Sequence, residues 1–200
     1  VKVLIKESMG FGIFFMWPML LIMAASAESL VSVILTDTWS EAVPYLRIFC
    51  FVCLTFPIQT ANFNALKAKG SSNICLLTQI IETVIGMTLL LMAINKSVYW
   101  VSVMYLITSI ISTINIMFFS HKICNYSVKE QIIDIWKMII SGVVVYLSTR
   151  YIFLKNCLIT LIIQICVGLL VYLGMITILR VEYGRKVLRI IKKKKGRAYE

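Results

Sequence analysis

Residues 157–179 form the run CLITLIIQICVGLLVYLGMITIL, which contains no charged side chain over 23 positions. The hydrocarbon core of a bilayer is about 30 Å thick, and a helix needs about 20 apolar residues to cross it. A run of this length and composition is longer than a soluble protein needs for a core helix. It therefore predicts a membrane-spanning helix, and the rest of the chain is best examined for further runs of this kind.

The composition of the whole chain agrees with this interpretation. Of the 200 residues, 60% are hydrophobic and 14% are charged, and the mean hydropathy is +0.91. Globular domains contain about 45–50% apolar and about 25% charged residues. The composition thus excludes a water-soluble enzyme, a disordered chain and a soluble nucleic-acid-binding module.

Polar breaks divide the chain into six long apolar runs, which predict an all-α polytopic membrane protein. We expect residues 1–9 to be the end of a preceding element or a cytoplasmic segment, the connection 121–134 to hold a short surface helix in its second half, and residues 180–200 to form a basic cytoplasmic tail. The expected spans are 10–35, 43–66, 74–94, 98–120, 135–153 and 157–179.

The distribution of Lys and Arg predicts the orientation, because the side richer in these residues stays in the cytoplasm. With the N-terminus inside, the inner segments hold 16 of the 20 basic residues. The outer connections hold three, which are Lys96, Arg150 and Lys155, and Arg47 lies within a span. We therefore expect six spans with both termini of this segment in the cytoplasm.

The tail 180–200 holds nine of the 20 basic and two of the nine acidic residues, and so carries +7 of the net charge of +11. Basic clusters beside a membrane span bind anionic lipid, at about 1 kcal/mol per Lys or Arg. This explains the basic charge without nucleic acid. The residues expected on anionic phospholipid are Arg185, Lys186, Arg189, Lys192, Lys193, Lys194 and Lys195.

Glu28, Arg47 and Glu82 are the charged side chains inside the expected spans that need an explanation, because a charge at membrane depth is costly unless it is paired or hydrated. Glu28 and Arg47 flank the first outer hairpin at a similar depth, about 10 Å from the surface at 1.5 Å per residue. They could pair and simply hold two helices together, or line a substrate or ion path. Glu82 falls near the midplane of the third span and is harder to explain by structure alone.

The second span is unusually polar. Thr55, Gln59 and Asn62 fall within about 60° of one another at 100° per residue, and Pro57 frees a carbonyl one turn before it. A broken helix of this kind is tolerated in a membrane where its backbone faces protein or a water-filled cavity. The stripe therefore lines a cavity or hydrogen-bonds to neighbouring helices.

No pattern of metal-ligating or catalytic residues stands out. Cys50 and Cys53 form a C-x-x-C inside an apolar helix with no second pair nearby, and His121 is the only histidine. Zinc sites need four such ligands at suitable spacing. We expect no metal, no cofactor and no enzymatic activity.

Five segments around the second span together resemble a known pattern. They are AESL (27–30), LTDTW (35–39), AVPYLRI (42–48), FP (56–57) and NFNALKAKGSS (62–72). This pattern resembles the C-terminal half of bacterial polysaccharide flippases, the lipopolysaccharide and O-antigen unit exporters of the multidrug/oligosaccharidyl-lipid/polysaccharide superfamily.

The resemblance implies a transporter of two six-helix lobes that rock about a central cavity in the bacterial cytoplasmic membrane. Its cargo would be an oligosaccharide on undecaprenyl pyrophosphate, moved outward for surface polysaccharide biosynthesis. This chain would supply the C-terminal lobe. Its partners would be the lipid-linked oligosaccharide, anionic phospholipid, and an N-terminal lobe or other polysaccharide assembly proteins.

Under this resemblance, Arg47 would contact anionic or sugar groups, with Gln59, Asn62 and Asn64 as partners of sugar hydroxyls. Glu28 or Glu82 would couple transport to an ion gradient. Family members often carry basic residues in the helix after the glycine turn, where this chain has Thr78, Gln79, Glu82 and Thr83.

Two alternatives stay open. A drug or metabolite exporter of the same superfamily would have the same number of helices. The second is a non-transporting membrane scaffold or remnant.

Overall fold

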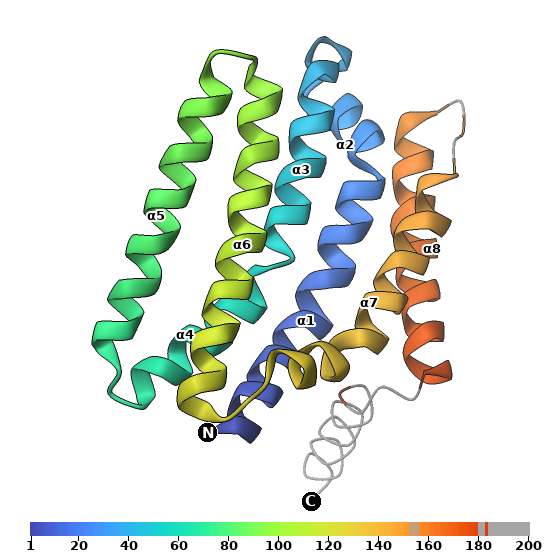
Figure 1. The fold of residues 1–200 in the computed structure, drawn as a ribbon. Helices are drawn as coiled ribbons and strands as arrows, with labels where there is room; N and C mark the ends of the chain where they lie inside the picture. The colour runs from blue at the N-terminus through green and yellow to red at the C-terminus, as the bar shows by residue number, and fades with distance from the viewer. Residues whose placement is uncertain (153, 155, 180–182, 184–200) are drawn as a thin grey trace, which may run out of the picture.

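A computed structural model describes residues 1–152, 154, 156–179 and 183, and these residues contain helices and no strand (Figure 1). The fold is therefore all-α, as the apolar runs predict. The helices are α1 (Lys2–Ala25), α2 (Ala27–Ile34), the 3-10 helix η1 (Asp37–Ala42), α3 (Val43–Cys53), α4 (Phe56–Ala68), α5 (Ser72–Ile94), α6 (Val98–Cys124), α7 (Val128–Arg150) and α8 (Cys157–Ile178).

Six helical segments of the described chain are long and apolar enough to cross a membrane. Five of them are α1, α5, α6, α7 and α8, and the sixth, Thr38–Ala68, comprises η1, α3 and α4. The expected number of spans is confirmed, and the chain is a multi-pass membrane protein.

The first helix begins earlier than predicted. Residues 2–9 are not a separate segment, because α1 runs without a break from Lys2 to Ala25. The charges of Lys2 and Lys6 do not end the helix, since each forms an ion pair with an acidic residue of α7. The expected run 10–35 also divides at Ser26, where α2 begins as a separate helix.

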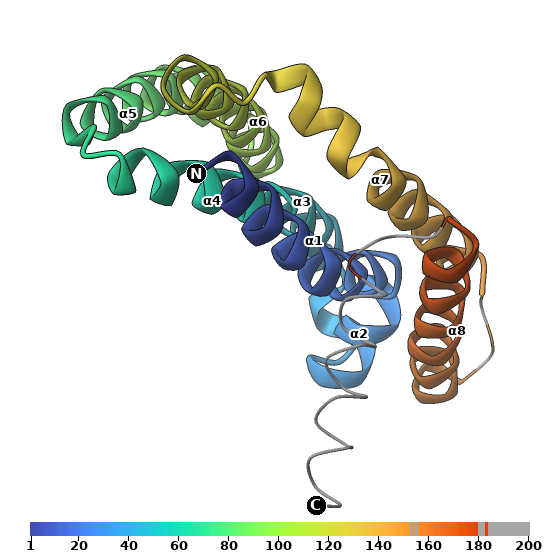
Figure 2. The same ribbon diagram turned by 90° about the horizontal axis from the view of Figure 1, so that it is seen from below.

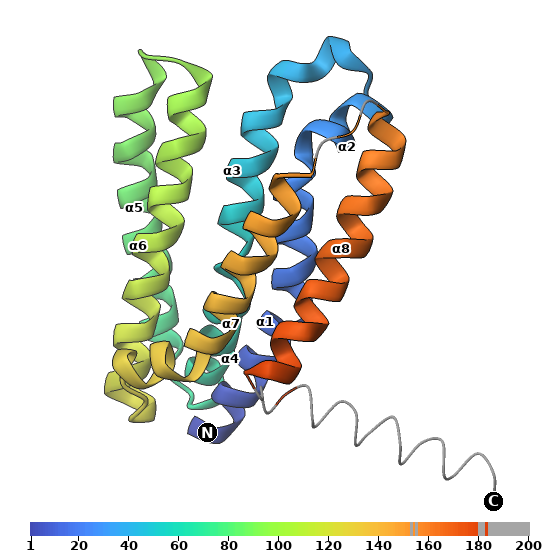
Figure 3. The ribbon, with the colours of Figure 1, turned by 90° about the vertical axis from the view of Figure 1, so that its right-hand side faces the viewer.

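The fifth expected span, which corresponds to α7, also begins earlier than residue 135. Its N-cap Ser127 and Glu130 form a capping box, in which each side chain bonds the backbone N–H of the other residue. The surface helix expected within 121–134 is continuous with α7. In Figures 1 and 3 the first turns of α7 run across the lower end of the bundle before the helix rises beside α8.

The second span is broken where Pro57 predicts. Helix α3 ends at Cys53, and α4 starts at Phe56 with Pro57 in its first turn. The break leaves the carbonyl of Leu54 free for a side chain, and the indole Nε1 of Trp17 donates to it at 2.8 Å. The freed backbone group is thus paired with α1 and does not face water.

Helix α1 lies at the centre of the bundle (Figure 2). It packs against α3, α4, α7 and α8, while α5 packs chiefly against α6 at one edge of the molecule. The largest buried cluster follows one face of α1 and includes Met9, Ile13 and Trp17 with Met138 and Val145 of α7. The basic residues expected on anionic lipid, 185–195, lie outside the described residues.

Candidate substrate-path site

Arg47 on α3 forms the expected ion pair with Glu28. Its guanidinium Nη2 lies 2.7 Å from Oε1 of Glu28, and its Nε donates to the carbonyl of Ala24 at 3.3 Å. Ala24 is near the C-terminal end of α1, where a cation interacts favourably with the helix dipole. The Arg47 side chain is 19% exposed and that of Glu28 46%. Arg47 therefore ties α3 to α1 and α2, and its charge is already balanced.

Gln59 and Thr55 of the polar stripe face α6. The amide nitrogen of Gln59 donates to Oγ1 of Thr113 at 2.8 Å and to the carbonyl of Ser109 at 3.1 Å. The hydroxyl of Thr55 lies 2.7 Å from that of Ser109. These bonds join the break in the second span to α6, as polar side chains commonly do between membrane helices.

Asn62 points to a different neighbour. Its side chain is completely buried and donates to the carbonyl of Ile58 at 2.8 Å and to Oε1 of Gln131 on α7 at 3.0 Å. Asn62 lines no cavity in this structure, because no surface of the residue is accessible, and its role as a partner of sugar hydroxyls stays a prediction. Asn62 and Gln59 instead connect α4 to two different helices.

Asn64 is exposed on α4, and no hydrogen bond joins its side chain to a described residue. It does not line either of the cavities described below.

Of Glu28, Arg47 and Glu82, Glu82 on α5 is the one that the structure leaves without a partner among the described residues. Its side chain is exposed, and no hydrogen bond or ion pair joins it to any described residue. It borders two neighbouring cavities, one of about 210 Å³ and one of about 400 Å³. A free carboxylate at membrane depth that borders two cavities marks a functional-site candidate.

The smaller cavity lies between α4, α5 and α6 and is lined mainly by amide and hydroxyl side chains. Gln59 takes part in its wall. The lining residues are Gln59, Thr60, Phe63, Thr78, Gln79, Glu82, Ser112 and Ile116.

The larger cavity lies between α3, α5 and α6 and is mainly apolar. Gly86 lets α6 approach here, since a Cβ at this position would lie 3.2 Å from Cγ2 of Thr108. The lining residues are Phe49, Glu82, Thr83, Gly86, Met87, Leu90, Val101, Ser102, Met104, Tyr105 and Thr108. The two cavities share Glu82: most residues that line the smaller one are polar, although more of its exposed surface is apolar than polar, and the larger one is almost wholly apolar.

Sequence reasoning missed an ion-pair network at the end of the bundle where α1 and α7 begin. Lys2 Nζ lies 2.9 Å from Oε1 of Glu130, and Lys6 Nζ lies 2.6 Å from Oδ1 of Asp134. The sequence does carry a signal for it. Lys2 and Lys6 lie four residues apart, and so do Glu130 and Asp134, so each helix presents two like charges on one face and the two faces have opposite sign.

Tyr126 completes this network by donating its hydroxyl to Oδ2 of Asp134 at 2.6 Å. Burial and the hydrogen bond to Asp134 raise the pKa of the Tyr126 phenol. The phenol consequently stays protonated and remains a donor at neutral pH. Both carboxylate oxygens of Asp134 are therefore engaged.

Among the described residues, no group of three or more His, Cys, Asp or Glu side chains could hold a metal ion. Cys50 and Cys53 are free thiols on α3. Comparison of the chain with protein-family models, with curated proteins and with solved structures gave no match.

Proposed function

We propose that this chain is the C-terminal lobe of a transporter that moves lipid-linked oligosaccharide across the bacterial cytoplasmic membrane. The observation that carries the proposal is the polar cavity beside the apolar cavity, with Glu82 at their shared border. The sequence motifs around the second span, which resemble polysaccharide flippases, supply the substrate class.

A cargo of this class is amphipathic, and the two cavities have matching chemistry. Sugar hydroxyls donate to carboxylates and exchange hydrogen bonds with amides and hydroxyls. Gln59, Gln79 and Glu82 offer such groups in the polar cavity. The other cavity is lined by Met87, Leu90 and further apolar side chains, which suit a hydrocarbon chain. The cargo would therefore keep its sugars and its lipid on opposite sides of Glu82.

Arg47 has a smaller part in this proposal than the sequence indicates. Its ion pair with Glu28 and its bond to the Ala24 carbonyl would have to break before it could bind a pyrophosphate. We therefore assign Glu28 and Arg47 to holding α1, α2 and α3 together, and Glu82 to the cargo or to a coupling ion.

The orientation follows from the positive-inside count, which puts both ends of this segment in the cytoplasm. The ion-pair network of α1 and α7 then lies on the cytoplasmic side, and Glu28 lies near the outer side. The smaller cavity borders α4 and the first half of α5, and so lies in the half of the bundle that this count assigns to the cytoplasm. This is the side from which a cytoplasmically assembled oligosaccharide would enter.

The test uses the complete gene in its source bacterium. Deleting it should abolish surface polysaccharide and cause lipid-linked oligosaccharide to accumulate on the inner leaflet, and the native gene should restore both. Glu82→Ala should lower transport about tenfold or more at normal protein level, because a hydrogen bond to a charged group contributes about 1.5–3 kcal/mol. The matched control is Thr88→Ala, since Thr88 is exposed on the same helix and borders neither cavity.

Each other outcome contradicts the proposal in a distinct way. Unchanged polysaccharide in the deletion strain, with a raised intracellular drug or dye level, would favour an exporter of small molecules. If the deletion strain loses its polysaccharide and the Glu82→Ala variant restores it fully, the result would favour a scaffold that supports assembly without carrying cargo.

A further inference from the structure

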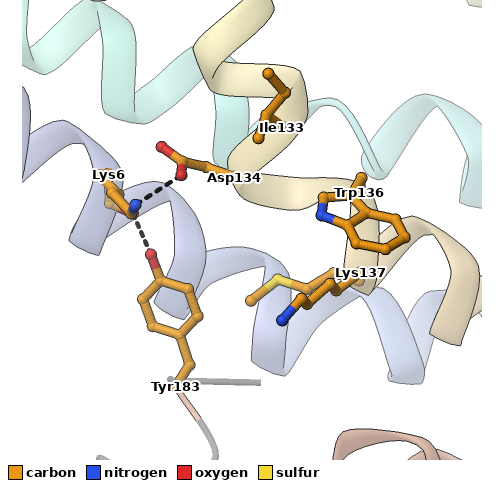
Figure 4. Close-up of a pocket in the computed structure, with 7 residues that line it drawn as sticks. Lys6, Ile133, Asp134, Trp136, Lys137 and Tyr183 are labelled. Carbon is orange, nitrogen blue, oxygen red and sulfur yellow. Dashed lines mark hydrogen bonds and ion pairs between the residues drawn. The ribbon is translucent and has the colours of Figure 1, made fainter. Parts of the chain in front are cut away.

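A third cavity lies at the end of the bundle where α1 and α7 begin, away from Glu82 (Figure 4). It measures about 150 Å³ and is lined by side chains of α1 and α7 together with Tyr183. Tyr183 donates its hydroxyl to the carbonyl of Lys6 at 3.0 Å, which closes one side. The lining residues are Lys6, Ile133, Asp134, Trp136, Lys137, Met138 and Tyr183.

The charges that line this cavity do not cancel. Asp134 is satisfied, because Oδ1 lies 2.6 Å from Nζ of Lys6 and Oδ2 accepts the hydroxyl of Tyr126. No hydrogen bond or ion pair joins Lys137 to a described residue. Figure 4 shows its ammonium near the cavity with no dashed line to it. Among the described residues that line the cavity, Lys137 is therefore the one positive charge without a partner.

The rim of the cavity is apolar and exposed. Ile133 is 64% exposed and Trp136 is 45% exposed. Both lie in the first part of α7, which crosses the lower end of the bundle in Figures 1 and 3. Tryptophan is enriched at the membrane–water interface, where its ring sits at the level of the lipid headgroups. A tryptophan and an isoleucine on the rim fit a cavity at headgroup depth whose apolar side faces the bilayer.

We propose that this cavity binds the headgroup phosphate of an anionic phospholipid, with Lys137 as the cation that contacts the phosphate. Trp136 and Ile133 pack against the glycerol and the first carbons of the acyl chains. Basic pockets between membrane helices at the cytoplasmic surface suit such headgroups. The site is independent of the proposed transport function and differs from the basic tail, because its residues lie on α1 and α7.

An attached lipid suits the site better than free phosphate does. Free phosphate would gain only the contact with Lys137, whereas a lipid also covers the exposed apolar rim. A zwitterionic lipid such as phosphatidylcholine carries a compensating choline charge and gains less from an uncompensated ammonium. The expected order of binding is therefore phosphatidylglycerol, then phosphatidylcholine, with inorganic phosphate weakest.

The test is native mass spectrometry of the full chain, titrated in detergent with phosphatidylglycerol and separately with phosphatidylcholine. Lys137→Gln should weaken the tightest phosphatidylglycerol binding about fivefold, as expected for the loss of one Lys at a membrane surface. The matched control is Lys129→Gln, because Lys129 is exposed on the same helix and lines no part of the cavity. Both variants keep the basic tail, so the difference between them isolates the cavity.

Lys137→Arg should retain phosphatidylglycerol binding, which shows that the charge and not the packing of the stem matters. Brominated phosphatidylglycerol should quench the fluorescence of Trp136 more than brominated phosphatidylcholine does. The contribution of Trp136 is the difference in quenching between the native chain and Trp136→Phe. Equal effects of Lys137→Gln and Lys129→Gln, equal binding of the two lipids, or displacement of the lipid by millimolar inorganic phosphate would each overturn the proposal.

Discussion

Replacing Asn62 with leucine should weaken the contact between α4 and α7. Asn62 is fully buried and donates to Oε1 of Gln131, which is also fully buried and in turn donates to the carbonyl of Tyr126. Leucine has the same number and branching of non-hydrogen side-chain atoms but no donor. The Gln131 oxygen would therefore be left without its partner inside the protein.

The expected loss in the free energy of unfolding is about 1–2 kcal/mol. A buried polar group left without a partner costs about 1–3 kcal/mol. The native Oδ1 of Asn62 has no partner among the described residues, and its removal offsets part of that loss. Hydrogen bonds between membrane helices contribute about 0.6 kcal/mol on average and at most about 1.7 kcal/mol, so the coupling between Asn62 and Gln131 should fall in this range.

A double-mutant cycle of Asn62→Leu and Gln131→Met measures that coupling. Each variant is unfolded by sodium dodecyl sulfate in mixed micelles, with loss of helical circular dichroism as the signal. Asn64→Leu serves as the control, because Asn64 is exposed nearby and should change stability by less than about 0.5 kcal/mol.

Two results would refute the reasoning. A coupling within about 0.5 kcal/mol of zero would place Asn62 and Gln131 among pairs that do not touch. Loss of transport in Asn62→Leu at unchanged stability would show instead that Asn62 contacts the cargo.

Three further substitutions test how the helices pack and can be measured with the same titration. Gly142→Ala should lower the free energy of unfolding by about 1–3 kcal/mol, because the added Cβ would lie 2.6 Å from Cδ1 of Leu21. Gly174→Ala meets no atom within 4 Å and should raise stability by up to about 1 kcal/mol, so equal effects at the two glycines would count against the packing described. Trp17→Phe should cost about 1 kcal/mol through loss of the bond to the Leu54 carbonyl, and an unchanged stability would mean that this carbonyl finds another donor.

The number and approximate positions of the spans could be predicted because they depend on the length of apolar runs, which is a local property of the chain. The run 157–179 corresponds to the helix Cys157–Ile178, and Pro57 marks the break between α3 and α4. The starts of the first and fifth spans were predicted too late, and both starts carry charged residues. Composition placed the start of the first span at residue 10, whereas α1 begins at Lys2, because lysine is itself a good helix former. The contact of Lys6 with Asp134, 128 residues away, could not be read from composition.

The candidate site was predicted less well than the spans. The partner of Arg47 could be anticipated, since Glu28 lies at the same depth across one short hairpin. The partners of Gln59 and Asn62 could not, because one side chain bonds to α6 and the other to α7 although they lie three residues apart on one helix. No sequence pattern specifies which neighbour a membrane helix presents to each face.

By itself the sequence determined that this chain is an all-α membrane protein with six spans, where the second span breaks, and which few polar residues lie within the membrane. Only the tertiary structure decided which of those residues are engaged in helix contacts and which remain available. Asn62 and Arg47 are committed to neighbours, while Glu82 borders two cavities and Lys137 borders a third. The physical reason is that crossing a bilayer requires only apolar length, whereas hydrogen-bond partners depend on how helices distant in sequence pack together, and lipid gives no hydrophobic pattern that marks those contacts.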